Sequence, residues 1–439
     1  MSTHHMISTP RHRPHYPPPI PQNHPPLLSL PNPLLNRILS HLSTHSLSQI
    51  HSTCHHLNIL SARPLYRIIY LHPDRFMALV ESLARNAHLR EMVEVLTIHD
   101  HHTVDTDYAD ALARVVALLG NMRMLRIKGC YTRTLEGVVP GGPAQEIPGW
   151  SNVYAPVLNS PFLTRLEYCE ISLSACEIWP MSTRENIFLH PTLRKLSILG
   201  ASIPSFPRYN QTLHGTTNLQ DLALLCCDIS ASTVSKLVSL PRALRRFTMA
   251  GARQLGDGEF TDTRHERYFA ALHVQAASLK VLEMGLWNFK KGHGAPIDLR
   301  AFTVLEQFTL TPLMLPPDEG QGHFHYLTPI LQHGFPATLK NIVLFHLHHE
   351  TFHIVERIIL AQLVRMFEAG GLPNLRTVTL ATPVFTDRYA GMDLGVPVDW
   401  RRVFGGRVRV SRREVTNMKR FPVDCQCSDY EMGKWVVWA

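Results

Sequence analysis

The chain has 439 residues, of which 45% are hydrophobic and 18% are charged. This length argues for more than one folding unit or for one elongated repeat array, and the composition excludes a chain that is disordered throughout. Lys and Arg outnumber Asp and Glu by 43 to 35, and the net charge of +8 is modest at this length. It hints at an acidic partner surface, whereas nucleic-acid binding would need a denser basic stripe with interleaved aromatic residues.

Several features of the sequence indicate a cellular location. Eight cysteines are scattered along the chain without CxxC pairs, which is typical of free thiols in a reducing compartment. No run of about 18 apolar residues is present, so no membrane-spanning helix is expected. The His- and Pro-rich N-terminus lacks the apolar stretch of a signal peptide. We therefore expect a protein of the cytoplasm, the nucleus or both, with neither a membrane nor a nucleic acid as partner.

Residues 1–28 are rich in His and Pro, and we predict a disordered tail with polyproline II character. Three short helices follow in residues 29–72. Asn32 and Pro33 are typical of a helix start. Ser46 indicates the start of the second helix, and Pro64 the start of a third that runs through Ile69. The first helix carries one broad apolar face, which consists of Leu34, Leu35, Ile38, Leu39 and Leu42.

About forty residues bury only a thin core, so these apolar helices suggest docking to another protein, or packing on the rest of the chain. The segment resembles the F-box. The positions that match its pattern are Leu30, Pro31, Leu34, Leu35, Ile38, Leu39, Leu42, Leu47 and Cys54. Pro33 and Ser46 stand where the family often has acidic residues, but both still start helices. The resemblance implies that these nine positions bind the Skp-type adaptor, and through it the cullin, of a ubiquitin ligase.

After residue 90 an apolar pattern of the form L-x-x-L-x-L recurs ten times, with aliphatic and aromatic substitutes. Its central residues are Leu96, Leu125, Leu166, Leu196, Leu222, Phe247, Leu282, Phe308, Ile342 and Val378. The alternation predicts a strand with one buried face in each copy, and helical stretches lie between copies. One strand and one helix cannot bury their apolar faces alone, so neighbouring copies must stack.

The predicted fold class is therefore α/β, with a short all-α F-box of three helices followed by an irregular leucine-rich-repeat solenoid. The solenoid is expected over residues 73–385, and residues 386–439 are expected to form a C-terminal cap or tail. No Asn consistently follows the strands, so the asparagine ladder of the strict repeat is not expected. A Leu-rich α/β protein without true repeats is the alternative, because it could produce the same matches.

Strand positions that face away from the core would line the concave surface of such a solenoid. They include Arg126, Arg165, Glu167, Lys195, Asp221, Arg246, Glu283 and Gln307. The mixture is basic in the earlier copies, which favours a protein substrate with an acidic segment. The substrate-binding residues predicted on this basis are Arg126, Arg165, Lys195 and Arg246. Solvated charge without a ligand is the alternative at each of them.

One motif points to catalysis. His349 to His353 read HExxH, which on a helix places two imidazoles one turn apart to bind zinc, with Glu350 activating water. A match to so short a motif can arise by chance in a chain with 27 histidines, and the apolar residues of this helix are expected to pack on the repeats. The His99–His102 cluster is interpreted as a surface loop. P-loop, GxGxxG and GxSxG motifs are absent, so we expect no catalytic residue, metal or cofactor.

These observations favour a non-enzymatic substrate-recognition subunit of an SCF-type ubiquitin ligase, with a protein substrate that the sequence does not identify. One alternative is a leucine-rich-repeat scaffold unconnected with ubiquitin, whose N-terminal helices only cap the repeats. A more remote alternative is a zinc hydrolase that uses His349 and His353.

Overall fold

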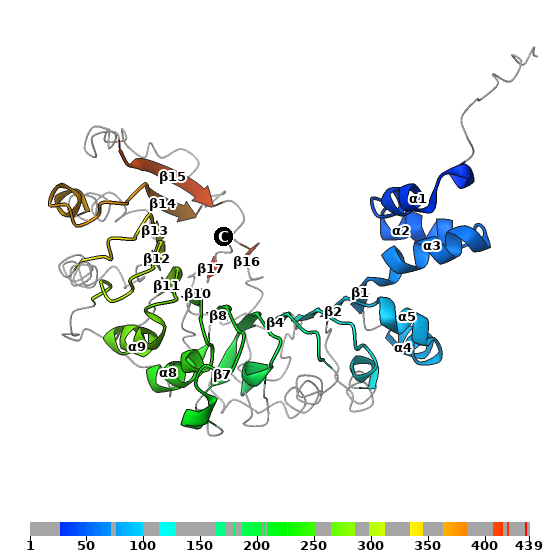
Figure 1. Cartoon of the computed structure of the whole chain (residues 1–439), viewed down its shortest axis with the longest axis horizontal. Coiled ribbons are helices and arrows are strands. Elements are labelled where there is room, and N and C mark those ends of the chain that lie inside the picture. Colours follow the sequence, from blue (N-terminus) through cyan, green and yellow to red (C-terminus); the bar gives the residue numbers. More distant parts are fainter. Residues whose placement is uncertain are drawn as a thin grey trace, which may run out of the picture. The chain divides into compact units, whose positions relative to one another are not determined.

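The computed structural model divides into two compact units, residues 1–65 and residues 66–439, which are described separately (Figure 1). The structure describes residues 27–71, 76–99, 114–128, 163–172, 179–180, 187–203, 205–206, 209–225, 227–250, 265–285, 298–311, 334–345, 363–383, 407–415, 419–420 and 435–436. Within these residues, no helix has both the length and the apolar character needed to cross a membrane.

The N-terminal unit contains the short helical module that the sequence predicts. A 3-10 turn η1 (Leu27–Ser29) precedes helices α1 (Asn32–Leu39), α2 (Thr44–His51) and α3 (His55–Tyr66). Pro33 lies at the second position of α1, where its missing N–H leaves no hydrogen bond unmade. The N-cap of α2 is Ser43, whose hydroxyl accepts a hydrogen bond from the N–H of Ser46 at 3.2 Å.

The start and end of the third helix differ from the prediction. Helix α3 begins at His55, and Pro64 lies inside it rather than at its start. Residues Ile68–Leu71 form strand β1, not the end of a helix. Strand pairing decides this outcome, because in β1 the side chains of Ile69 and Leu71 are buried against the larger core of the second unit.

The second unit is built on a twelve-stranded sheet whose described pairings are all parallel. Its strands, in spatial order, are β1 (Ile68–Leu71), β2 (Val95–His99), β3 (Met124–Lys128), β4 (Tyr168–Ser172), β6 (Lys195–Leu199), β8 (Asp221–Leu225), β10 (Arg246–Ala250), β11 (Val281–Gly285), β12 (Gln307–Thr311), β13 (Asn341–Phe345), β14 (Thr377–Pro383) and β15 (Arg409–Val415). Spatial order follows chain order throughout this sheet (Figure 1). Strand β15 falls in the segment that the sequence assigns to a C-terminal cap or tail.

Smaller elements complete the second unit. A separate three-stranded parallel sheet contains β5 (Trp179–Pro180), β7 (Ala201–Ile203) and β9 (Asp228–Ile229), and β16 (Lys419–Arg420) pairs antiparallel with β17 (Trp435–Val436). The remaining helical elements are α4 (Phe76–Arg85), α5 (Ala87–Met92), η3 (Ile187–Leu189), η4 (Gln211–Leu213), α8 (Ala231–Ser239), α9 (His265–Leu272) and η5 (His273–Gln275).

The second position of every strand in the large sheet lies in one continuous register. This row, which we call the core row, contains Ile69, Leu96, Leu125, Cys169, Leu196, Leu222, Phe247, Leu282, Phe308, Ile342, Val378 and Val410. Its members from Ile69 to Val378 are buried. Because successive side chains of a strand point to opposite faces, the core row places one face of the sheet against the helices.

The register predicted for the third copy of the pattern is wrong by three residues. Cys169 aligns with Leu125 and Leu196, so the strand position predicted for Leu166 belongs to Cys169. Leu163 and Leu166 are both buried in the turn before β4. Apolar residues repeated every three positions fit two frames of the pattern equally well, and only the hydrogen bonds between strands select one of them.

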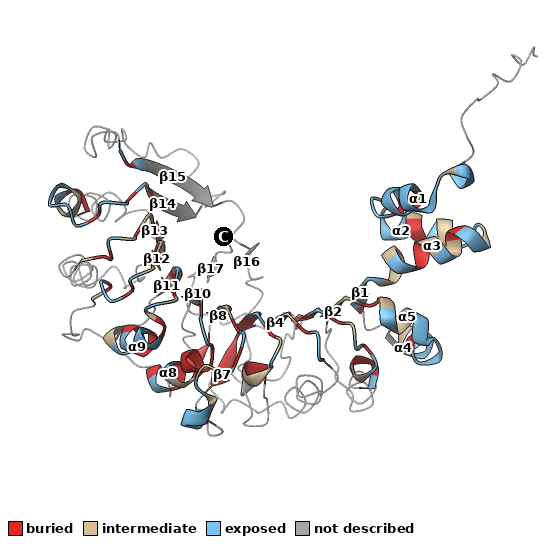
Figure 2. Cartoon of the chain, in the orientation of Figure 1, coloured by how far each residue is buried: buried red, intermediate tan, exposed pale blue. Residues whose placement is uncertain are grey.

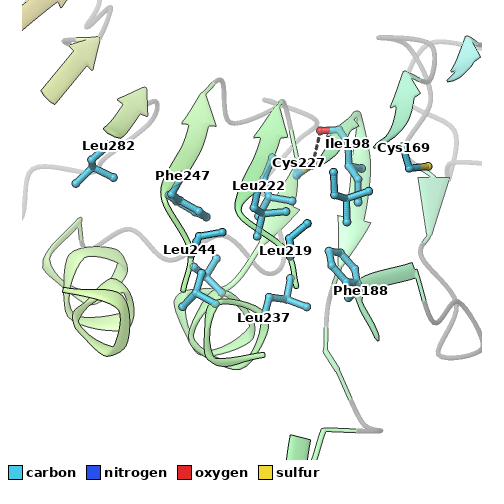
Figure 3. Packing of buried hydrophobic residues seen from close by; sticks show 14 of the residues in the cluster. Cys169, Phe188, Ile198, Leu219, Leu222, Cys227, Leu237, Leu244, Phe247 and Leu282 are labelled. Carbon is cyan, nitrogen blue, oxygen red and sulfur yellow. Dashed lines mark hydrogen bonds between the residues drawn. The ribbon is translucent and has the colours of Figure 1, made fainter. Parts of the chain in front are cut away.

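Helices α8 and α9 cover the core row near the middle of the sheet (Figures 1 and 2). Val234 and Leu237 from α8, and Phe269 and Leu272 from α9, are buried in the same cluster as the strand residues. Figure 3 shows Leu237 beside Leu219 and Leu244, beneath the core-row residues Leu222 and Phe247. In the same region the thiol of Cys227 donates a hydrogen bond to the carbonyl of Ile198 at 3.6 Å.

A ladder of polar side chains joins successive turns just before the strands. In six of these turns, an Asn, Thr or Ser directly before a buried Leu or Met donates a hydrogen bond to a backbone carbonyl of the preceding turn, at 2.7–3.0 Å. The donors are Asn121, Thr192, Asn218, Ser278, Thr338 and Asn374. The ladder therefore satisfies turn carbonyls at the start of the strands, whereas the asparagine ladder of the strict repeat lies after them.

One turn is closed by a buried amide. The side-chain nitrogen of Gln275 donates to the carbonyls of Val238 and Pro241 at 2.8 and 2.9 Å. Its side-chain oxygen accepts from the N–H of Leu244 at 2.9 Å and, at 2.6 Å, shares the hydroxyl proton of Ser278 with the carbonyl of Leu244. All the hydrogen-bonding positions of the amide are thus used to hold η5 against the turn that follows α8.

Replacing Gln275 by Ala removes all four of these hydrogen bonds from a buried site. Because each buried polar group that loses its partner costs about 1–3 kcal/mol, we expect the free energy of unfolding to fall by about 3 kcal/mol. Urea denaturation followed by circular dichroism measures the change. The control is Val274→Ala at the exposed neighbouring position, which should change the free energy by less than about 0.5 kcal/mol. Equal losses in the two variants would contradict this role for Gln275.

Candidate interaction surfaces

The nine positions predicted to bind the adaptor do not share one environment. Leu35, Leu39 and Leu47 are 1%, 2% and 4% exposed and form the internal core of the N-terminal helices. Leu34 and Ile38 are 49% and 41% exposed. The remaining positions are exposed at Pro31 and half-buried at Leu30, Leu42 and Cys54.

Leu34 and Ile38 are four residues apart on α1, so both side chains lie on the same side of the helix. Leu27 and Leu28 in η1 are exposed as well. Large apolar side chains that do not contribute to the core of a small unit typically mark a surface that contacts another protein. The exposed side of α1 is therefore the candidate docking surface of the N-terminal unit.

A polar network fixes α2 against α3 behind this surface. The side-chain amide nitrogen of Asn58 donates both to Nε2 of His51, at 3.0 Å, and to the carbonyl of His51, at 3.0 Å. An amide nitrogen only donates, so Nε2 accepts and Nδ1 carries the ring proton. Nδ1 then donates to the hydroxyl of Ser61 at 3.1 Å, and Ser61 donates to the carbonyl of Asn58. Ser61 is fully buried.

We expect His51→Ala to loosen the contact between α2 and α3, because the buried hydroxyl of Ser61 loses its partner on the ring at a cost of about 1–3 kcal/mol. Amide hydrogen exchange of residues 44–66 in the full-length chain, followed by mass spectrometry, should become faster by about tenfold or more. His55→Ala at the exposed first turn of α3 is the matched control and should leave exchange unchanged. Unaltered exchange in His51→Ala would show that the network does not hold the helices.

The predicted substrate-binding residues lie on the second unit, but not all on its sheet. Arg126, Lys195 and Arg246 are at the third or first positions of β3, β6 and β10, on the face opposite the core row. Arg165 and Glu167 lie in the turn before β4, so their predicted place on the strand is wrong. The frame error in the third copy explains this difference. Glu170 aligns with Arg126, at the position that the predicted frame gave to Glu167.

Arg126, Tyr168 and Glu170 form one cluster on neighbouring strands. The Arg126 guanidinium lies 5.5 Å from the centre of the Tyr168 ring, and its Nε is 3.2 Å from Oε2 of Glu170. The Tyr168 hydroxyl donates to the same carboxylate oxygen at 3.0 Å. Burial raises the pKa of Tyr168 from 10.0 to about 12, and the charge and hydrogen bond of Glu170 add to the effect.

The raised pKa of Tyr168 makes the stability of the fold depend on pH in the alkaline range. The neutral phenol is favoured in the folded state, so its contribution is complete below the unfolded pKa of 10.0 and is lost as the pH rises through about 12. We expect the urea midpoint of the wild type to fall more steeply over this range than that of Tyr168→Phe. The other tyrosines are common to both proteins and cancel in the comparison. Parallel pH dependence would contradict this assignment.

A second cluster follows along the same face. Glu283 lies 3.9 Å from the Arg246 guanidinium and accepts a hydrogen bond from the Thr248 hydroxyl at 2.9 Å. Asp221 is half-buried between the strands of Lys195 and Arg246. Burial raises the pKa of the Asp221 carboxyl, and the positive charges of Arg246 and Lys195 oppose that rise.

The first and third positions of β3 to β11 therefore carry balanced charge. The bases are Arg126, Lys195 and Arg246, and the acids are Glu170, Asp221 and Glu283. Over the second to sixth copies, the corrected register reduces the excess of bases that the sequence indicated but does not remove it, because Glu170 joins the face while Arg165 and Glu167 both leave it.

A further row of mostly charged residues, not predicted from the sequence, lies immediately before the strands. This leading row consists of Arg67, Glu94, Arg123, Glu167, Arg194, Gln220, Arg245, Lys280, Glu306, Lys340 and Arg376. Each of its carbonyls from Arg67 to Lys340 accepts two N–H groups from the start of the next strand, at 2.8–3.1 Å, so neighbours in the row are neighbours in space. The pattern could have been found by reading one position before each predicted strand.

Ion pairs join two sections of the leading row. Arg123 contacts Glu167 at 2.7 Å, and the hydrogen bond raises the pKa of the Arg123 guanidinium. Glu306 lies 3.0 Å from Lys340 and 3.9 Å from Lys280, and the hydrogen bond from Lys340 lowers the pKa of Glu306. These pairs are exposed, so each contributes little to stability and mainly balances local charge.

No metal-binding cluster is found among the described residues: no three His, Cys, Asp or Glu side chains there could hold an ion together. The HExxH motif at His349–His353 and most of the His99–His102 cluster lie outside the residues that the structure describes.

Comparison with known protein families gives a match for one part of the chain. Residues 27–68 match the F-box domain. The match takes in η1, the three helices of the N-terminal unit and the first residue of β1. The F-box predicted within residues 29–72 is therefore confirmed as a domain, with matched residues 27–68, and the match supports an F-box protein. No curated protein matches the chain at a significant level.

Proposed function

We propose that the protein is the substrate-recognition subunit of an SCF-type ubiquitin ligase. The observation that carries the proposal is the F-box at residues 27–68, since F-box domains bind Skp-type adaptors and through them a cullin. F-box proteins are typically adaptors without catalytic activity. Catalysis would then arise from proximity, because a tethered substrate is held at raised effective concentration near the transferring subunits.

The adaptor contact is assigned to the exposed side of α1. Leu34 and Ile38 supply apolar area at the surface, while Leu35, Leu39 and Leu47 support the helix from inside. Full burial of one exposed side chain contributes about 1.5–3 kcal/mol, and because Leu34 and Ile38 are already about half-buried, each would add roughly half of that to the affinity.

Substrate binding is assigned to residues 73–385, in the form of a leucine-rich-repeat-like solenoid. Three features of the sheet support this assignment: its strands follow chain order, the core row is continuous, and a polar ladder joins the turns. Arg126, Lys195 and Arg246 are the charged positions that a substrate would contact on a concave face. The proposed location is the cytoplasm, the nucleus or both, in keeping with the free thiols of Cys54, Cys169 and Cys227.

Co-expression with a Skp-type adaptor tests the adaptor contact. We expect the full-length chain to elute with the adaptor in gel filtration. Leu34→Asp/Ile38→Asp should lose the complex while circular dichroism and thermal unfolding stay unchanged, because both positions are exposed. Leu35→Asp/Leu39→Asp should lose the complex by unfolding the helices, because each substitution buries a charge.

A matched control separates the α1 surface from exposed apolar area in general. Leu118→Asp/Val274→Asp also changes two exposed apolar residues, both in the second unit, and should keep the complex. Failure of the folded wild type to bind the adaptor would sink the proposal. It would leave a repeat scaffold whose N-terminal helices are only a cap.

A further inference from the structure

The charges of the leading row alternate in sign at its start, and the alternation ends at Gln220. Its first five residues, from Arg67 to Arg194, are alternately basic and acidic. The next position would continue the alternation with a carboxylate, but it holds Gln220. Arg245 and Lys280 then follow without an acid between them.

Gln220 lies directly between two arginines. Its N–H donates to the carbonyl of Arg194 at 2.8 Å, and its own carbonyl accepts from the N–H of Arg245 at 2.8 Å. Neighbouring strands are about 4.8 Å apart, so Arg194 and Arg245 start about 10 Å from each other on either side of an uncharged amide. The nearest acid in the row, Glu167, is engaged by Arg123.

The first strand positions add to this charge. Lys195 follows Arg194 and Arg246 follows Arg245 along the chain, while Asp221 is the acid between them. Within the described part of the chain, no ion pair joins Arg194, Lys195 or Arg245 to a carboxylate. All three residues are exposed. The basic strip formed by Arg194, Lys195, Arg245 and Arg246 thus carries four positive charges against two carboxylates, Asp221 and Glu283, and Glu283 lies 3.9 Å from Arg246.

We infer that this basic strip binds an acidic peptide segment of a partner protein, with Gln220 at its centre. The partner is the substrate of the proposed function, on which this inference rests. An extended peptide places side chains of one face about 7 Å apart, and long flexible arginines reach carboxylates at that spacing. Binding by Glu or Asp side chains would supply the negative charges that the row lacks between Arg194 and Arg245.

The observations favour a peptide over a nucleic acid. A single-stranded nucleic acid requires aromatic side chains on which its bases stack. None of the residues of the strip is aromatic, and neither are Gln220 and Asp221. The strip spans the neighbouring strands β6, β8 and β10, and it reaches a fourth strand, β11, only if Lys280 is included. Four strands make a short track for a phosphate backbone.

Substitution of the central residue gives the sharpest test. Gln220→Glu should supply the missing carboxylate and pair with Arg194 and Arg245, as Glu306 does with Lys280 and Lys340. We expect it to weaken binding of fluorescein-labelled hexaglutamate by about tenfold at low salt, measured by fluorescence anisotropy. Gln220→Leu changes the same side chain without adding charge and should bind as the wild type does.

Charge reversal provides the second arm. Arg194→Glu/Arg245→Glu should abolish hexaglutamate binding, whereas Arg85→Glu/Lys236→Glu, on helices α4 and α8, makes the same net change elsewhere and should retain it. Equal loss in these two double variants would show attraction by net charge alone and would overturn the inference. Wild-type affinity in a folded Gln220→Glu would overturn it too. If Arg194→Glu/Arg245→Glu does not fold, the comparison of Gln220→Glu with Gln220→Leu decides whether the strip binds the peptide.

Two further readouts complete the test. Tighter binding of an oligothymidylate than of hexaglutamate, lost in Gln220→Glu, would replace the peptide by a nucleic acid and overturn the inference. Adaptor co-purification of the same variants separates this inference from the proposed function. A strip that does not bind peptide in a chain that binds the adaptor sinks the inference alone. A chain that binds peptide but not the adaptor sinks the proposed function.

Discussion

The second unit depends on the parallel register of its sheet, in which each strand begins at the same point as its neighbours. From β2 to β14 the start of each strand is fixed by the carbonyl that precedes the neighbouring strand, which accepts two N–H groups there. Shifting one strand by one residue would turn its apolar side chains from the helices to solvent. One repeated backbone interaction thus places the core row, the polar ladder and the leading row at the same time.

The same register explains why charges that are far apart in the sequence act together. Arg123 and Glu167 are 44 positions apart, yet they form a 2.7 Å ion pair because the strands that follow them are neighbours. Such exposed pairs hardly stabilise the fold. Their effect is to cancel charge locally, so a position without its acid, such as Gln220, leaves basic side chains free to meet a partner. Local charge balance, more than the net charge of the chain, thereby determines where an acidic segment would bind.

The two units offer surfaces of different chemistry. In the N-terminal unit, Leu35, Leu39 and Leu47 are buried together with Leu57 and Ala62, whereas Leu34 and Ile38 remain at the surface. On the central strands β3 to β11, the face of the sheet opposite the core row carries interleaved acidic and basic side chains. An apolar anchor site and a charged recognition site suit a protein that holds two different partners.

The sequence by itself determined the F-box, the strand-forming copies of the apolar pattern and the candidate bases Arg126, Lys195 and Arg246. The F-box follows from the resemblance of its residues to a known family, and the other features depend on local periodicity and residue type, which a single chain displays directly. Tertiary structure alone decided that Ile68–Leu71 joins the sheet, because an apolar tetrapeptide after a helix fits a strand as well as a helical turn. It also decided that Cys169 and not Leu166 occupies the core row, that Leu34 and not Leu35 is exposed, and that Gln220 separates two arginines. Each of these outcomes depends on which strand or helix is the neighbour, and no pattern along one segment contains that information.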